Sequence, residues 1–238
     1  MIIDTRSFDL LRKSLKIFFN DKNFDAFIVS LKKHYFNAQT KCVNNDKVLK
    51  KIRTYINNNR YNNNKHIKQV YLFHITRLIK KVKHLLNLTQ LLTTNNDFLK
   101  FLLDNGFNLD ELKKNPTIDY RLKEDPCVNG FCFRMHLEFQ KDGYYENIKS
   151  GGSELLRCFG EDLIKKFVQS SKFYCVHCKV NILDIIFDGK RSKTSNEVEF
   201  LSYCMLALVV YPESQIYNPI IRLKDDYNCE VLHCEELA

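Results

Sequence analysis

The 238-residue chain lacks any run of about 18 uncharged apolar residues, so we expect no transmembrane helix and no membrane partner. Its first residues reach Asp4 and Arg6 before any apolar stretch, which argues against a secretory signal. We therefore expect an intracellular protein. In such a reducing compartment, nine cysteines are more often free thiols or metal ligands than disulfides.

The signatures of common enzyme classes are also missing. The chain has no Gly-x-Ser-x-Gly, no His-Glu-x-x-His and no kinase pattern. Gly151 and Gly152 precede a predicted helix, but the Gly-Lys-Ser/Thr of a phosphate-binding loop and the dinucleotide glycine pattern are absent. We expect a flexible turn there, and a protein that is not an enzyme.

Charge is distributed unevenly along the chain. Residues 1–115 hold 22 Lys and Arg against 9 Asp and Glu, whereas residues 116–238 hold 15 against 19. A strongly basic half attracts nucleic acid or an acidic protein. The alternative is an ordinary solvated surface in a chain that is generally rich in Lys and Asn.

The change of composition at Pro116 predicts two domains. Residues 1–115 are expected to form a basic, all-helical domain, because apolar residues recur there at spacings of three and four. Ser7 is a suitable cap for the first helix. The expected helices cover residues 8–19, 23–36, 45–57, 65–93 and 98–104.

Residues 116–238 hold eight of the nine cysteines and are expected to form a cysteine-rich mixed domain, which makes the whole an α+β protein. Asn129-Gly130 suits a two-residue turn, so a hairpin is predicted over Cys127–Cys132 with a strand continuing to Phe139. A final hairpin is expected around Asp225-Asp226. Helices are expected over 154–170 and 196–211, and a short β-like run over 182–187.

The pair Cys175-x-x-Cys178 is the sharpest motif. Zinc prefers four tetrahedral sulfur and nitrogen ligands, which often arrive as two closely spaced pairs. We predict a structural zinc site, and the alternative is a reduced pair without metal. The second pair of ligands would come from Cys229, His233 and Cys234.

A second metal site is also predicted from the sequence. In the expected hairpin, His136 lies four residues after Cys132 and on the same face of the strand. Buried core cysteines are the competing interpretation, since free cysteine is among the most buried residue types. The candidate ligands are Cys127, Cys132, His136 and Cys158.

A redox function is a third interpretation of Cys175 and Cys178. A dithiol site needs its first thiolate at a helix N-terminus, where the pKa of the thiol is lowered. No Pro or Gly separates the two cysteines, and no thioredoxin-like order of strand and helix surrounds them. The zinc interpretation is therefore preferred.

Nucleic-acid binding is predicted from the helix expected over 65–93. Its basic residues surround the helix, so it can lie along phosphates and bind without sequence preference. The alternative is an adaptor whose basic helices contact an acidic protein. The candidate contacts are Lys65, Lys68, Arg77, Lys80, Lys81 and Lys83.

The motif Cys175-Val-His-Cys178, followed by Cys229 and Cys234 in a chain rich in Asn and Lys, resembles cysteine-rich proteins of large insect DNA viruses. The family it resembles most is the major early zinc-finger proteins of baculoviruses. The resemblance covers only the cysteine-rich half. It implies a zinc-stabilised viral accessory or regulatory protein in the nucleus or cytoplasm of a host cell, where it supports gene expression or nucleocapsid production.

Overall fold

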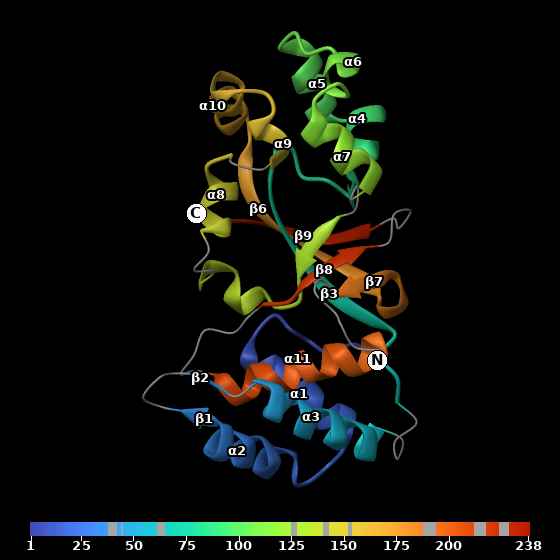
Figure 1. Ribbon diagram of the computed structural model, residues 1–238, viewed down its shortest axis with the longest axis vertical. Helices are drawn as coiled ribbons and strands as arrows, with labels where there is room; N and C mark the ends of the chain where they lie inside the picture. The colour runs from blue at the N-terminus through green and yellow to red at the C-terminus, as the bar shows by residue number, and fades with distance from the viewer. Residues whose placement is uncertain are drawn as a thin grey trace. The chain divides into compact units, whose positions relative to one another are not determined.

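The computed structural model describes residues 1–37, 42–43, 45–60, 65–124, 128–139, 143–151, 154–187, 194–211, 218–223 and 229–238. The fold is mixed α/β, with a sheet in the order β4-β9-β6-β3-β5-β8-β7 and a separate pair β1-β2 (Figure 1). The coarse expectation of an α+β protein is confirmed. The strands are β1 (Phe36–Asn37), β2 (Cys42–Val43), β3 (Gln69–Leu78), β4 (His84–Leu85), β5 (Asn129–Phe131), β6 (Lys172–Asn181), β7 (Ile185–Phe187), β8 (Ile220–Leu223) and β9 (Cys229–Glu236).

The chain divides into two compact units, each built from three segments. Among the described residues, every helix is too short or too polar to cross a membrane. The first unit comprises Met1–Tyr71, Phe131–Phe139 and Val180–Ile221, and the second comprises Leu72–Gly130, Gln140–Lys179 and Arg222–Ala238. Pro116 begins a helix inside the second unit. The division of the chain into domains 1–115 and 116–238 stays a prediction.

The first unit is organised around α11 (Asn196–Val210), which packs against α1 (Phe8–Phe19), α2 (Phe24–Tyr35) and α3 (Asn45–Arg60) (Figure 1). These four helices confirm the expectations from periodicity. The side chain of Ser7 accepts a hydrogen bond from the Leu10 amide and caps α1 as predicted.

The helix α11 is buried on nearly all sides, as its continuous apolar sequence predicts. Its one buried acid, Glu199, needs a partner, because a carboxylate without one is costly to bury. Arg53 of α3 supplies it, with 3.0 Å between Arg53 Nη2 and Glu199 Oε2, and Thr194 donates a further hydrogen bond.

The prediction of one helix over residues 65–93 is wrong. Gln69–Leu78 is the strand β3, and His84–Leu85 is the strand β4. The sequence Val70-Tyr-Leu-Phe-His-Ile-Thr76 is dense in aromatic and β-branched residues, which favour a strand. The apolar residues of this segment also recur at spacings of three and four, which led to the helix prediction. Burial in the sheet determines the conformation instead.

Helices of the second unit enclose a separate apolar core. A single helix was expected over 154–170, but Gly160 adopts φ 86° and separates α9 (Glu154–Arg157) from α10 (Glu161–Ser170). The other helices of this unit are α4 (Leu88–Thr93), α5 (Asp97–Asp104), α6 (Leu109–Leu112), α7 (Pro116–Glu124) and α8 (Tyr144–Lys149). The buried core residues are Leu92, Leu102, Leu112, Ile118, Leu156, Phe159, Leu163 and Phe167.

Arg77 of β3 closes the end of α10. Its guanidinium donates to the carbonyl oxygens of Val168 at 2.9 Å and Ser171 at 2.7 Å, and to that of Lys149 at 2.6 Å. The last carbonyls of a helix have no partner within the helix, so a cation that bonds to them stabilises its end. Arg77 therefore fastens α10 to the sheet.

The hairpin expected around Asn129-Gly130 is wrong. Both residues lie within β5, and Arg134–Phe139 is a 3-10 helix where a strand was expected. A Cβ atom at position 130 would lie 2.6 Å from Leu72 Cγ, so Gly130 allows a close approach of two strands instead of a turn. Cys127 and Gly152 lie outside the described residues.

The final hairpin is also wrong, because β9 neighbours β4 and β6, whereas β8 neighbours β5 and β7. The turn expected at Asp225-Asp226 lies outside the part of the chain that the structure describes. The expectation of a strand that begins at Cys229 is confirmed, because Cys229–Glu236 is the strand β9. The change of neighbour is important, because it pairs β9 with the strand that carries Cys175.

The helical core of the second unit can be tested by adjacent substitutions in α5. Leu102 is fully buried, whereas Leu103 is 51% exposed. We expect Leu102→Ala to lower the free energy of unfolding by about 2–5 kcal/mol, because it removes buried contacts and leaves a cavity. Leu103→Ala in the same helix should cost less than about 1 kcal/mol. Equal losses in urea unfolding would contradict this core.

Candidate metal centre

Four potential metal ligands share one face of the β6–β9 pair. The strands are antiparallel, with Cys175 opposite Glu235. Two residues along, His177 lies opposite His233. Directly paired residues project from the same face of a sheet, and so do residues two apart in one strand. The four side chains therefore begin at the corners of one patch on that face.

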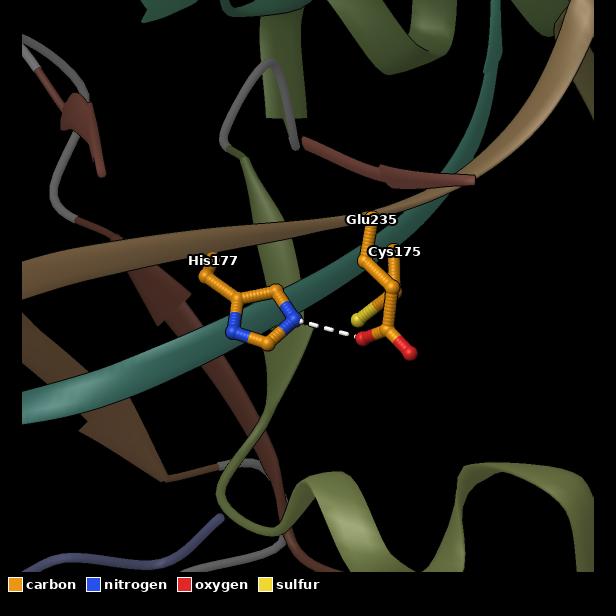
Figure 2. A group of neighbouring side chains, drawn as sticks. All are labelled: Cys175, His177 and Glu235. Atoms are coloured by element: carbon orange, nitrogen blue, oxygen red, sulfur yellow. Dashed lines mark hydrogen bonds and ion pairs between the residues drawn. The ribbon is translucent and has the colours of Figure 1, made fainter. Parts of the chain in front are cut away.

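Three of these side chains converge. The donor atoms of Cys175, His177 and Glu235 all lie within 4.8 Å of one another. His177 Nε2 donates a hydrogen bond to Glu235 Oε2 at 2.8 Å (Figure 2). Cys175 is fully buried, while the side chains of His177 and Glu235 are 12% and 34% exposed. The site therefore lies at the boundary between the core and solvent.

Aromatic contacts fix the His177 ring. Phe73 of β3 contacts it edge-on, with ring centroids 5.1 Å apart. The ring of His233 lies 5.5 Å from that of His177, also edge-on. His233 is itself exposed, so its ring can rotate toward the three converging donors at little cost.

This donor set matches the chemistry of zinc. Thiolate sulfur, imidazole nitrogen and carboxylate oxygen all bind Zn²⁺, at about 2.0–2.3 Å. Ligands of a tetrahedral ion at those bond lengths are about 3.3–3.8 Å apart. Side-chain adjustments of about 1 Å would bring Cys175, His177 and Glu235 to that spacing.

The predicted ligand set is divided between the two faces of the sheet. Cys175 and His233 lie on the face just described, but Cys234 pairs with Val176 and so projects from the opposite face. The pairing shifts between His177 and Cys178, where Cys178 moves opposite Val231, and Cys178 also belongs to the opposite face. Within the described residues, the group of three that converges includes none of Cys178, Cys229 and Cys234.

The opposite face carries a small group of buried thiols. Cys178 is hydrogen-bonded to Cys229, and this contact, together with burial, raises the pKa of the Cys178 thiol well above its ordinary value. Cys234 Sγ lies 3.8 Å from the Val82 carbonyl oxygen, to which it donates weakly. The motif lies in the middle of β6 and not at a helix N-terminus. The condition for a reactive Cys-x-x-Cys dithiol is therefore not met.

His177 and Glu235 were not among the ligands predicted from the sequence. A signal for both was present, because Cys175-x-His177 and His233-x-Glu235 alternate as strand residues on one face do. The zinc prediction was built on pairs of cysteines and did not use this alternation. The register that brings the two strands together was not available from either segment alone.

Two of the four ligands of the second predicted metal site, Cys132 and Cys158, have described side chains, and the site stays a prediction. Cys132 is fully buried in the first unit, and burial, with a smaller contribution from Cys204, raises the pKa of its thiol. Cys158 belongs to the second unit, where it packs against the apolar core. Cys127 and the side chain of His136 lie outside the described part of the chain. The competing interpretation of Cys132 as a core cysteine fits its burial.

The predicted basic stripe does not lie on one helix. Lys65 and Lys68 precede β3 in the first unit, and Lys65 Nζ donates to the Ile17 carbonyl oxygen at 2.8 Å. Arg77 is engaged at the end of α10, and Lys80 is paired with Asp97. Lys80, Lys81 and Lys83 lie between β3 and β4, where all three are exposed.

Comparison with protein-family models, with curated proteins and with solved structures finds no match for this chain. The resemblance to the baculovirus zinc-finger proteins thus rests on the cysteine motif and stays a prediction. The β6–β9 site is defined by the contacts of its own side chains.

The burial of Cys132 predicts a slow reaction with alkylating agents. Burial raises the pKa of both Cys132 and Cys204, so little thiolate forms at pH 8, and neither side chain is accessible. Iodoacetamide should label the partly exposed Cys158 at least about tenfold faster, as measured by peptide mass spectrometry. Urea should remove the difference. Rapid labelling of Cys132 in the folded protein would contradict its place in the core.

Proposed function

We propose that this protein is a zinc-binding accessory protein without enzymatic activity, and that Cys175, His177 and Glu235 hold the ion. The observation that carries the proposal is the convergence of sulfur, nitrogen and oxygen donors from two paired strands. The ion would have a structural role, because it would link β6 to β9 by bonds stronger than the backbone pairing alone.

The arrangement of the three side chains favours a metal ion over a catalytic thiol. In a Cys–His–acid triad, one imidazole nitrogen faces the acid and the other faces the thiol. In Figure 2, the Cys175 sulfur lies on the side of the ring that faces Glu235, away from the second ring nitrogen of His177. All three donors thus surround one point.

His233 is the proposed fourth ligand. Structural zinc sites use four protein ligands, whereas catalytic sites keep one position for water. His233 lies opposite His177, and its ring is already in contact with the ring of His177. A closed site of one sulfur, two nitrogens and one oxygen agrees with a structural role.

Zinc titration of matched variants tests the site. The folded protein should bind one Zn²⁺, and zinc at 100 times its dissociation constant should stabilise the fold by about 2.7 kcal/mol. Cys175→Ser and Glu235→Gln should each weaken binding at least about tenfold, because each removes a ligand atom. Affinity is measured by competition with a chelator, and stability by thermal unfolding.

The controls come from the neighbouring residues. Glu236 is adjacent to Glu235 but pairs with Lys172, so Glu236→Gln should bind zinc like the unmodified protein. Cys229→Ser alters the opposite face and should also retain the metal. A loss of zinc in Cys229→Ser as large as in Cys175→Ser would point instead to the ligand set predicted from the sequence, which includes Cys178 and Cys229. His233→Ala should weaken binding if the site is closed, and it should have no effect if the fourth position belongs to water.

A second proposed property is non-specific contact with phosphates. Its support is the exposed basic segment between β3 and β4, which contains Lys81 and Lys83. Arg77 is omitted, because its guanidinium holds the end of α10. Such contacts would suit the viral accessory function that the resemblance to baculovirus zinc-finger proteins implies. An acidic protein is the alternative partner for the same lysines.

Charge reversal tests the phosphate contacts. Lys81→Glu with Lys83→Glu should weaken binding of duplex DNA and reduce the slope of log affinity against log salt by about 2, since each phosphate contact contributes about 0.9. The matched control is Lys113→Glu with Lys114→Glu, which changes two exposed lysines of the same unit. Filter binding that is unaffected by salt or by the first pair would reject this property. Retention of an acidic protein without DNA would support the adaptor.

A further inference from the structure

The second unit contains a cavity of about 610 Å³ that lies apart from the metal ligands. This volume is within the range of about 300–1,000 Å³ that is usual for small-molecule sites. The wall is mainly apolar, and it includes side chains from β3, α4, α5, α9 and α10. Its apolar residues include Ile79, Leu88, Leu91, Phe98, Leu155 and Phe167.

The charged residues of the wall are unbalanced. Asp97 is the acid among the lining residues, and it is paired with Lys80. Arg77, Arg121 and Arg157 also line the cavity. The wall therefore carries more positive than negative charge.

Two of these arginines bond to neutral acceptors. Arg157 Nη2 donates to Asn147 Oδ1 at 2.7 Å, and Arg77 donates to backbone carbonyls and to Ser171 Oγ. Within the described residues, neither has a carboxylate partner. Burial lowers the pKa of Arg77, which is the effect expected of a cation whose lost hydration is not fully replaced. An anion in the cavity would offset that loss.

We propose that this cavity binds a small amphipathic anion, with an apolar chain or ring against the aliphatic and aromatic wall and a carboxylate or phosphate group at Arg157. A neutral apolar molecule would leave the guanidinium charges uncompensated. A free phosphate would leave most of the apolar wall unfilled. Arg157 is exposed, and among the described residues its guanidinium donates to Asn147 through Nη2. Its other N–H groups can make a bidentate contact with an oxyanion.

Calorimetric titration with four probes tests both halves of this ligand. Decanoate and decyl phosphate carry the apolar chain and the charge, decanol carries the chain alone, and inorganic phosphate carries the charge alone. We expect the first two to bind at least tenfold more tightly than the last two. The stronger of decanoate and decyl phosphate identifies the head group. Equal binding of decanol and decanoate, or of inorganic and decyl phosphate, would overturn the proposal.

Two variants and one control test whether the probe binds in the cavity. Arg157→Gln should weaken decanoate binding at least tenfold, whereas Lys165→Gln, which changes an exposed cation of α10 outside the cavity wall, should leave it unchanged. Leu88→Trp should weaken binding by filling the apolar space, with circular dichroism to verify folding. Unchanged binding in both Arg157→Gln and Leu88→Trp would overturn the assignment. Zinc binding should be the same in all three variants, so failure here is distinguishable from failure of the metal site.

Discussion

The register between β6 and β9 is the constraint on which the candidate site depends. It sets Cys175 opposite Glu235 and His177 opposite His233, so residues from two distant segments form one patch. A shift of one residue in the register of β6 against β9 would move the side chains of one strand to the other face, and the four residues would no longer lie together. The irregular pairing after His177 then assigns Cys178 to the opposite face. One strand pair therefore separates a mixed set of metal donors from a group of buried thiols.

The two faces differ chemically because their surroundings differ. Cys178 and Cys229 are buried and bonded to each other, which keeps the Cys178 thiol protonated. On the other face, His177 and Glu235 retain access to solvent, by which a hydrated ion can approach. A short cysteine spacing is thus weaker evidence for a zinc site than the face on which each side chain lies.

Local signals predicted the helices of the first unit well and the sheet poorly. Capping by Ser7 and the apolar spacing of α1, α2, α3 and α11 are properties of each segment alone, so the sequence sufficed. The strand β3 was mistaken for a helix because its burial depends on distant partners. Of the candidate ligands, Cys175 and His233 were predicted, but His177 and Glu235 became visible only through the pairing of β6 with β9. Register is a non-local property that no single segment contains.

X-ray absorption at the zinc edge is the most direct test of the central claim, because it counts sulfur neighbours of the ion. The proposed site predicts one sulfur at about 2.3 Å and the remaining ligands as nitrogen or oxygen at about 2.0–2.1 Å. A shell of three or four sulfurs would contradict it, since that result would require thiols from both faces of the sheet. Failure of the folded protein to retain any zinc would contradict it equally.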